Sequence, residues 1–289
     1  MDYLGTFELG LIFSLFVLGM VISFRLLSFA DLTIEGSFTT GGAVFATLIN
    51  QGFGSLESMF LAMLAGGFAG FITASLHCFL AINKLISGIV VLTLLYSVNL
   101  HVMGRSNIFI DLPTLLNQNI DKWFEFSILL FCCIIVFFVI KLLLSTNFGL
   151  FIRATGENES FVKNQKVNPK IFILVGLTIS NALIALSGCI FAQYIGYSDI
   201  GNGNGMLVSM LTAMIIGESI IRPVTLNRQI ISAFFGAIIF QYIYAFTLEI
   251  GVDPIDLKII IGVMLVLFLA ASKLIQRGKA TRNIGSNFI

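Results

Sequence analysis

Long apolar runs alternate with short polar stretches along almost the whole chain. Crossing about 30 Å of hydrocarbon takes about 20 largely apolar helical residues, and most of the runs approach or exceed that length. The pattern predicts membrane segments at Leu9–Phe29, Phe38–Ile49, Met59–Ile82, Leu85–Val102, Phe126–Leu144, Ile171–Tyr194, Met206–Ile221, Ile230–Leu248 and Leu257–Leu274. Phe38–Ile49 is too short to cross alone as a regular helix, and Met206–Ile221 is also short. We therefore predict one all-α polytopic membrane domain over residues 1–289, with about nine segments, two of them short or broken.

The composition supports a bilayer environment. The chain is 57% hydrophobic and 11% charged, whereas a soluble domain of this length needs far more charge to cover its surface. Its net charge of +1 and the absence of a basic stripe give no indication of a nucleic-acid partner. Cys78, Cys132, Cys133 and Cys189 lie in apolar runs without metal-ligand spacing, so we interpret them as small buried hydrophobes and predict no metal site.

The Lys and Arg residues predict the orientation of the chain. Cytoplasmic loops of membrane proteins retain basic residues. If the N-terminus lies outside, all sixteen Lys and Arg residues fall inside except Arg105, Lys122 and Lys258. This threading makes the loop at 145–170 and the C-terminal tail cytoplasmic.

Two polar interruptions resemble each other. Residues 28–38 contain Phe29-Ala-Asp-Leu32, residues 196–206 contain Tyr197-Ser-Asp-Ile200, and each stretch continues through glycine and polar residues into a short apolar segment. The threading puts the two stretches on opposite sides, as in an inverted-topology repeat with halves at about 9–102 and 126–274, whose broken helices flank a transport pathway. Two ordinary loops that share an aspartate are the alternative. Within the first stretch, Asp31 and Glu35 are candidates for the pathway or its gate, because charges at membrane depth usually face a cavity.

The loop at 145–170 is the largest cytoplasmic element of the threading. Gly156 punctuates it, Pro169 opens the next segment, and Glu157–Gln165 can form two helical turns. Phe161 and Val162 would then offer a small apolar knob in a charged surround, as in a helix that docks in a partner's groove. A plain loop is the alternative.

Four stretches carry a family resemblance. They are Asp31-Leu-Thr-Ile-Glu-Gly-Ser-Phe38, Met103-Gly-Arg-Ser-Asn107, Ile152-Arg-Ala-Thr-Gly-Glu-Asn158 and Ile215-Ile-Gly-Glu218. In this order the chain resembles, over nearly its whole length, the permease subunits of bacterial ABC importers in the branched-chain amino acid and ribose permease superfamily. It looks most like the amino-acid-type permeases for which tryptophan or tyrosine uptake has been proposed. The resemblance implies a type II ABC importer-like fold in the bacterial inner membrane.

The resemblance also implies roles for particular residues. The stretch that looks like the coupling helix for an ATPase subunit comprises Arg153, Ala154, Thr155, Gly156, Glu157 and Asn158, followed by Phe161 and Val162. The residues that look like the entry to the pathway are Asp31, Glu35, Gly36 and Ser37, and those that look like an external gate are Asn202, Gly203 and Asn204. The two asparagines depart from the apolar or small residues that are common there in the family.

The function implied is that of a permease subunit of an ATP-driven importer for a small solute such as an amino acid. It would pair with a second copy, a cytoplasmic ATP-binding subunit and an external substrate-binding protein. We expect no cofactor in this chain, because ATP and Mg²⁺ would bind the ATPase and the sequence has no G-x-x-x-x-G-K-[ST] motif. An ion- or proton-coupled secondary transporter with inverted repeats is the alternative, although its intramembrane acids and bases are few. A membrane-embedded enzyme is disfavoured because no H-E-x-x-H or similar constellation occurs.

Overall fold

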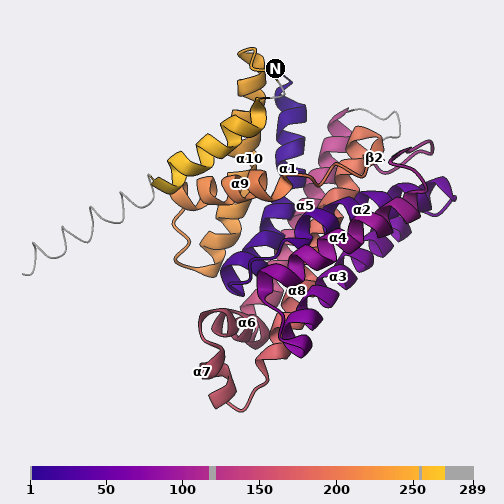
Figure 1. Ribbon diagram of the computed structural model, residues 1–289. Coiled ribbons are helices and arrows are strands. Elements are labelled where there is room, and N and C mark those ends of the chain that lie inside the picture. Colours follow the sequence, from indigo (N-terminus) through magenta and orange to yellow (C-terminus); the bar gives the residue numbers. More distant parts are fainter. Residues whose placement is uncertain (1, 117–121, 254–255, 271–289) are drawn as a thin grey trace, which may run out of the picture.

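The computed structural model describes residues 2–116, 122–253 and 256–270 (Figure 1). The elements are α1 (Tyr3–Met20), the π-helix η1 (Val21–Leu26), α2 (Thr33–Asn50), α3 (Ser55–Leu80), α4 (Lys84–Met103), β1 (Asn107–Phe109), α5 (Lys122–Ser145), α6 (Asn147–Glu157), α7 (Glu159–Asn164), α8 (Pro169–Ile195), β2 (Tyr197–Asp199), α9 (Met206–Ile220) and α10 (Leu226–Glu249). A further apolar helix covers Leu257–Ala270. The described chain is therefore mostly helical.

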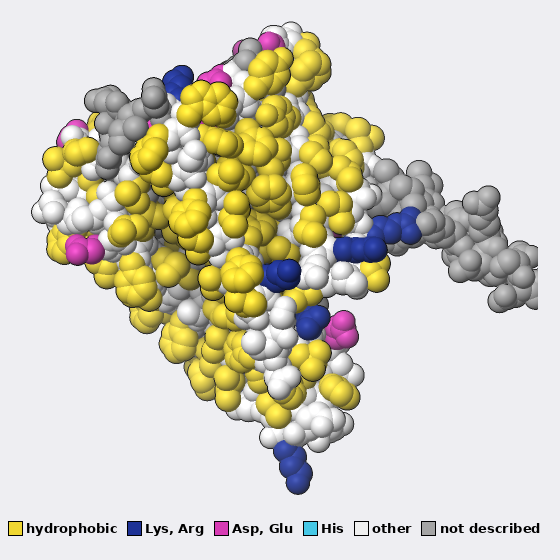
Figure 2. All heavy atoms as spheres, turned by 180° about the vertical axis from the view of Figure 1, so that it is seen from behind, with side chains coloured by type: hydrophobic (Ala, Val, Ile, Leu, Met, Phe, Trp, Pro, Cys, Tyr) yellow, Lys and Arg dark blue, Asp and Glu magenta, His cyan; other side chains and the backbone are white. Residues whose placement is uncertain are grey.

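Six helices are long and apolar enough to cross a membrane. They are Tyr3–Leu26, which joins α1 and η1, and α3, α4, α5, α8 and α10. The other three predicted segments fall on α2, α9 and Leu257–Ala270, and residues 271–274 of the last one lie outside the described residues. Figure 2 shows that hydrophobic side chains cover most of one side of the molecule, as expected for a surface in contact with lipid.

The start of the second segment was predicted wrongly. It was expected at Phe38, but α2 begins at Thr33 and is a regular helix of 18 residues. A carboxylate oxygen of Asp31 accepts a hydrogen bond from the amide of Thr33 at 2.9 Å, which satisfies an amide that the first turn leaves without a partner. Gly36 and Ser37 therefore lie inside a helix, and the non-helical break shrinks to residues 27–32.

Two short strands were not predicted. β1 pairs with β2 in antiparallel register, with Ile108 opposite Ser198. This pairing joins the α4–α5 connection to the α8–α9 connection. Tyr197–Asp199 is consequently a strand, whereas the matching Phe29–Asp31 belongs to neither a helix nor a strand.

α1 and α8 form the centre of the bundle. In an apolar 18-residue stretch of the joined helix Tyr3–Leu26, 78% is buried, and in such a stretch of α8, 67% is buried. α8 packs against α2 and α3, while α1 packs against α10. Glycines permit these close crossings: a Cβ on Gly41 would collide with the backbone of Ala185, and one on Gly188 with the backbone of Phe38. Gly66 lies in the G-x-x-x-G stretch of α3, and a Cβ there would collide with the Cβ of Ala185 in α8, so this motif packs helices within the chain.

Candidate functional site

The break between η1 and α2, residues 27–32, is the most unusual backbone in the core. The chain leaves the α-helix through the π-helical turn η1, a feature that often marks functional sites. The amide of Phe29 donates to the carbonyl of Ser23 at 2.8 Å, and that of Leu27 to the carbonyl of Ile22 at 3.0 Å. Ser28 has a φ of 49°, in the left-handed region. Leu27, Phe29 and Asp31 are buried, whereas Ser28 and Ala30 are exposed, so the break lies at the edge of the core.

Asp31 organises a buried polar network at this break. It is fully buried, and its second carboxylate oxygen accepts from the side-chain amide of Asn181 in α8 at 2.7 Å. The amide oxygen of Asn181 accepts from the hydroxyl of Ser37 at 2.7 Å. The hydroxyl groups of Thr33 and Thr73 form a hydrogen bond, with their oxygens 2.6 Å apart. The network thus connects the start of α2 with both α8 and α3, and a fully satisfied network of this kind specifies one packing arrangement.

Glu35 connects the first interruption to the second. One of its carboxylate oxygens accepts from the backbone amides of Gly205 at 3.0 Å and Leu207 at 3.1 Å, at the N-terminus of α9. A negative charge is favourable there because the first amides of a helix lack partners and carry the positive end of its dipole. Gly203 packs so closely on α2 that a Cβ would collide with the carbonyl of Glu35. The structure therefore brings together Glu35 and Gly203, which the sequence had suggested separately.

An ion pair holds the other end of α9. Arg25 in η1 forms a bidentate salt bridge with Glu218, with Nε–Oε1 at 2.6 Å and Nη2–Oε2 at 2.5 Å. The Glu218 side chain is only 14% exposed, and such paired geometry is the strongest form of a charge-assisted hydrogen bond. Sequence reasoning missed this pair. The available signal was a carboxylate within the apolar run of α9, since charges at membrane depth usually pair.

α6 packs directly on the break. The sequence predicted two helical turns within Glu157–Gln165, which α7 at Glu159–Asn164 confirms, whereas α6 at Asn147–Glu157 was not predicted. Gly156, in the last turn of α6, lies against the end of η1, where a Cβ would collide with the carbonyl of Leu26. Figure 1 shows α6 and α7 at the end of the molecule opposite the N-terminus. This pair of helices thus contacts the buried residues Leu26 and Leu27, where the break begins.

The remaining loop candidates differ in exposure. Glu157, Asn158 and Phe161 are exposed, Arg153 and Ala154 are half-buried, and Thr155 and Val162 are buried. The predicted apolar knob is therefore wrong for Val162, which is fully buried, whereas Phe161 is 53% exposed. Neighbouring residues of a helix point in different directions, so the two could not share one exposed face. Asn158 caps α7 by accepting a hydrogen bond from the amide of Phe161 at 3.1 Å.

The second interruption shares one local detail with the first. A carboxylate oxygen of Asp199 accepts from the amide of Gly201 at 2.7 Å, the same two-residue step as in the bond between Asp31 and Thr33. Asn204 is exposed, Asn202 is half-buried and Gly203 is buried.

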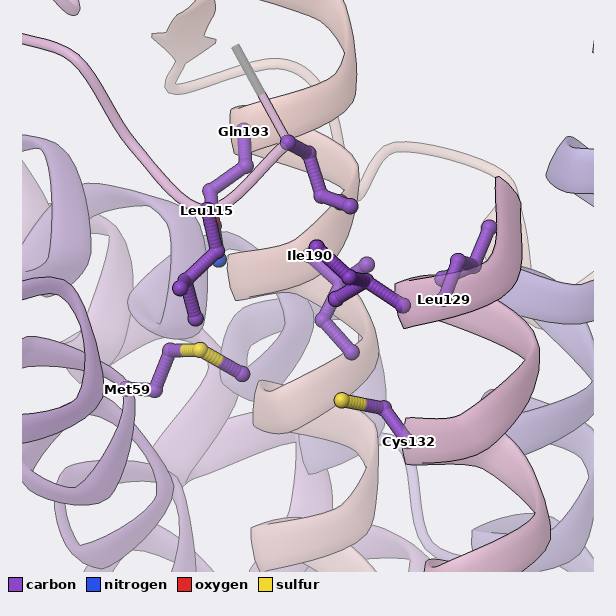
Figure 3. Close-up of a pocket in the computed structure, with 8 residues that line it drawn as sticks. Met59, Leu115, Leu129, Cys132, Ile190 and Gln193 are labelled. Atoms are coloured by element: carbon purple, nitrogen blue, oxygen red, sulfur yellow. The ribbon is translucent and has the colours of Figure 1, made fainter. Parts of the chain in front are cut away.

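A small pocket lies away from these contacts, between α3, α5 and α8 (Figure 3). Its volume is about 10 Å³, which is room for about one water molecule. It is lined by Met59, Leu115, Leu116, Ile128, Leu129, Cys132, Ile190 and Gln193. None of these is a predicted site residue, and the pocket is too small for a solute.

Comparisons with known proteins agree with one another. Residues 3–269 match the family described as branched-chain amino acid transport system / permease component. The tyrosine transport system permease protein of Clostridioides difficile is 34% identical over 266 residues, covering 92% of this chain and 89% of that protein. An uncharacterized protein of Rickettsia prowazekii is 38% identical over 272 residues, covering 92% and 96%.

A more distant relative is the autoinducer 2 import system permease protein of Escherichia coli. It is 26% identical over 191 residues, which cover 63% of this chain and 54% of that protein. No solved structure matches the chain.

The buried network predicts the effect of Asp31→Asn. Asparagine supplies one acceptor oxygen for two donors, the amide of Thr33 and the side chain of Asn181. A buried donor left without a partner costs about 1–3 kcal/mol, so Asp31→Asn should lower the thermal unfolding temperature of the purified protein.

The matched control exchanges the two groups in an Asp31→Asn, Asn181→Asp double variant. The amide introduced at the start of α2 can then donate to the carboxylate introduced on α8, and that carboxylate can still accept from the hydroxyl of Ser37. The double variant should therefore unfold at a higher temperature than Asp31→Asn alone. If it unfolds at the same temperature or a lower one, the network does not hold α2 to α8 as described.

Proposed function

The chain belongs to the family of branched-chain amino acid transport permease components, and from this membership we propose that it is the membrane-spanning permease subunit of an ATP-driven ABC importer. It forms the translocation pathway for a small solute and performs no chemistry itself. A separate cytoplasmic subunit binds and hydrolyses ATP with Mg²⁺. An external substrate-binding protein delivers the solute, and a second copy of the chain completes the pore.

One observation supports this function above the others: the helix pair α6 and α7 packs on the break through Gly156. Gly156 of α6 touches the carbonyl of Leu26, so a partner that moves α6 also pushes on the end of η1. Phe161 and Glu157 face outward from the same helix pair and offer the contact surface. A short helix with a few anchors is a common docking element.

Further contacts carry the movement from the break into the bundle. Arg25 in η1 holds the last turns of α9 through Glu218, and Glu35 in α2 holds its first turn. A movement on either side of the break therefore also moves α9. Moving a two-state equilibrium from about 1:99 to 99:1 takes about 5.5 kcal/mol of differential binding, which nucleotide and partner contacts can supply.

The inverted repeat and the orientation belong to the same proposal. α1 packs on α10 as α8 packs on α3, the arrangement expected if α1 corresponds to α8 and α3 to α10. The shared hydrogen bonds of Asp31 and Asp199 support this correspondence. Nine segments then cross the bacterial inner membrane, with the N-terminus outside and with α6, α7 and the C-terminus in the cytoplasm. The N-terminus and α6 do lie at opposite ends of the molecule (Figure 1).

We further propose that the solute is an amino acid with a hydrophobic side chain, in line with the tyrosine transport permease among the relatives. The direct experiment reconstitutes the chain in liposomes with its ATPase and binding protein and follows radiolabelled tyrosine, tryptophan and leucine. Uptake of at least one should require ATP. If the chain alone accumulates any of them on an ion gradient without the ATPase, it is a secondary transporter instead.

Gly156→Val should uncouple the importer. The added side chain cannot fit against the carbonyl of Leu26, so α6 must tilt away from the break. We expect ATP hydrolysis to persist while uptake falls at least about tenfold, a loss of about 1.4 kcal/mol of coupling.

Gly262→Val is the control, because a Cβ at Gly262 has no neighbouring atom within 4 Å. It should import at the wild-type rate. Unchanged uptake by Gly156→Val would show that this contact transmits nothing.

A charge exchange tests the ion pair. Arg25→Glu and Glu218→Arg each place like charges side by side and should slow uptake, whereas the variant with both changes restores opposite charges and should recover much of the rate. Coupling energies between residues in direct contact are about 0.5–3 kcal/mol. A double variant that is as slow as the slower single variant would contradict the role of the pair in transport.

A further inference from the structure

α4 carries polar side chains on the face that it turns away from the rest of the chain. Thr93, Ser97 and His101 are all exposed, and their spacing of four residues lines them up along one side of the helix. The opposite side is covered by α2 and α3. Asn99, on that covered side, accepts a hydrogen bond from the hydroxyl of Thr40 at 2.9 Å. The buried polar group thus has a partner on a neighbouring helix.

α5 shows what a lipid-facing helix looks like in the same chain. Both helices lie at the periphery of the bundle: only 28% of an apolar 18-residue stretch is buried in α4, and only 22% of such a stretch in α5. Between residues 128 and 140 of α5, the exposed side chains are nevertheless all apolar: Phe131, Ile134, Ile135, Phe138 and Val139. The polar line on α4 is therefore not a general property of the outer helices.

The polar groups on α4 keep unused hydrogen-bonding capacity. The hydroxyl of Thr93 donates to the carbonyl of Ile89 at 2.8 Å, and Nδ1 of His101 lies 2.8 Å from the carbonyl of Ser97. Each of these bonds stays within α4. Within the described residues, the hydroxyl of Ser97 and Nε2 of His101 make no hydrogen bond. Hydrocarbon offers no partner for such groups, and leaving them unpaired costs free energy, so water is the better neighbour.

We propose that this face of α4 lines the aqueous pathway, and that Thr93, Ser97 and His101 are the residues that the solute meets there. The inference rests on the proposed importer function. Along the helix, successive polar groups are about 6 Å apart, one turn each. They offer hydroxyl and imidazole partners without the strong charge of a carboxylate or an ammonium group. A pathway needs sites that bind strongly enough to admit a solute and weakly enough to release it.

The same face indicates the class of solute. Apolar side chains flank the polar line, among them Ile89, Val90 and Leu94, each at least 40% exposed. A surface that alternates hydrogen-bonding groups with aliphatic ones suits a solute with an apolar body and polar ends. A hydrophobic amino acid has this character, whereas a sugar or an inorganic ion does not.

Cysteine accessibility tests the proposal in the complete assembly. Thr93→Cys and Ser97→Cys are compared with Ile134→Cys, an exposed position near the middle of α5, after treatment of proteoliposomes with a small, positively charged, membrane-impermeant methanethiosulfonate. The wild-type chain sets the background, because Cys78, Cys133 and Cys189 are buried and Cys132 is half-buried. All three substitutions replace exposed side chains, and uptake before treatment confirms that each variant assembles.

We expect the α4 cysteines to react at least about tenfold faster than the α5 cysteine, since the reagent reacts from water and does not enter hydrocarbon. Modification of Ser97→Cys should abolish ATP-dependent uptake of whichever of tyrosine, tryptophan and leucine the wild type imports fastest. An excess of that amino acid together with ATP should slow the labelling.

Three other outcomes overturn the proposal. Labelling without loss of uptake would make the face wet but outside the pathway. Disulfide cross-linking of Ser97→Cys between two copies, without labelling, would make it a dry contact between subunits. Labelling as slow as that of Ile134→Cys, with no cross-link, would place it in lipid. A wild-type assembly that imports none of the three with ATP would instead contradict the proposed function, whatever the labelling shows.

Discussion

A backbone that leaves the helix inside a membrane protein must find other partners for its amides and carbonyls, and this constraint shapes the whole molecule. In hydrocarbon an unsatisfied backbone group costs several kcal/mol, so irregular backbone survives only where protein or water covers it. At residues 27–32 the π-helical turn supplies some of the partners, and Lys84 donates to the carbonyl of Ser28 at 3.2 Å. The carboxylate of Asp31 supplies another at the start of α2. The break is thus fixed in one geometry by groups from several helices.

In the proposed importer, this fixed geometry would let a small surface helix act on the centre of the bundle. α6 touches one side of the break through Gly156. The other side continues into Glu35, which holds the N-terminus of α9. A flexible connection would absorb a displacement of α6, whereas one held by hydrogen bonds from several elements would transmit it to α9. The short α9 contacts Glu35 at its first turn and Arg25 near its last turn. It is therefore the helix that such a displacement would reach.

The sequence predicted the apolar helices well and the polar contacts poorly. Long apolar runs have one stable form in a bilayer, so each predicted segment overlaps a helix among the described residues, and Met206 begins α9 as expected. α2 was misplaced because its first turn, with Thr33 and Glu35, is polar and its stability comes from Asp31. The contact between Arg25 and Glu218 joins residues 193 positions apart, which a single sequence does not encode as a local pattern. Buried Val162 needed the position of α7 against the bundle, which periodicity alone does not give.

The proposed function depends most on a contact between the helix pair α6 and α7 and the cytoplasmic ATP-binding subunit. Photo-cross-linking from a benzophenone amino acid in place of Phe161 tests this directly, since Phe161 is 53% exposed in α7. In membranes that contain the complete transport assembly, we predict that the adduct contains the ATP-binding subunit and that its yield depends on nucleotide. An adduct with the external substrate-binding protein, or with lipid alone, would contradict the account.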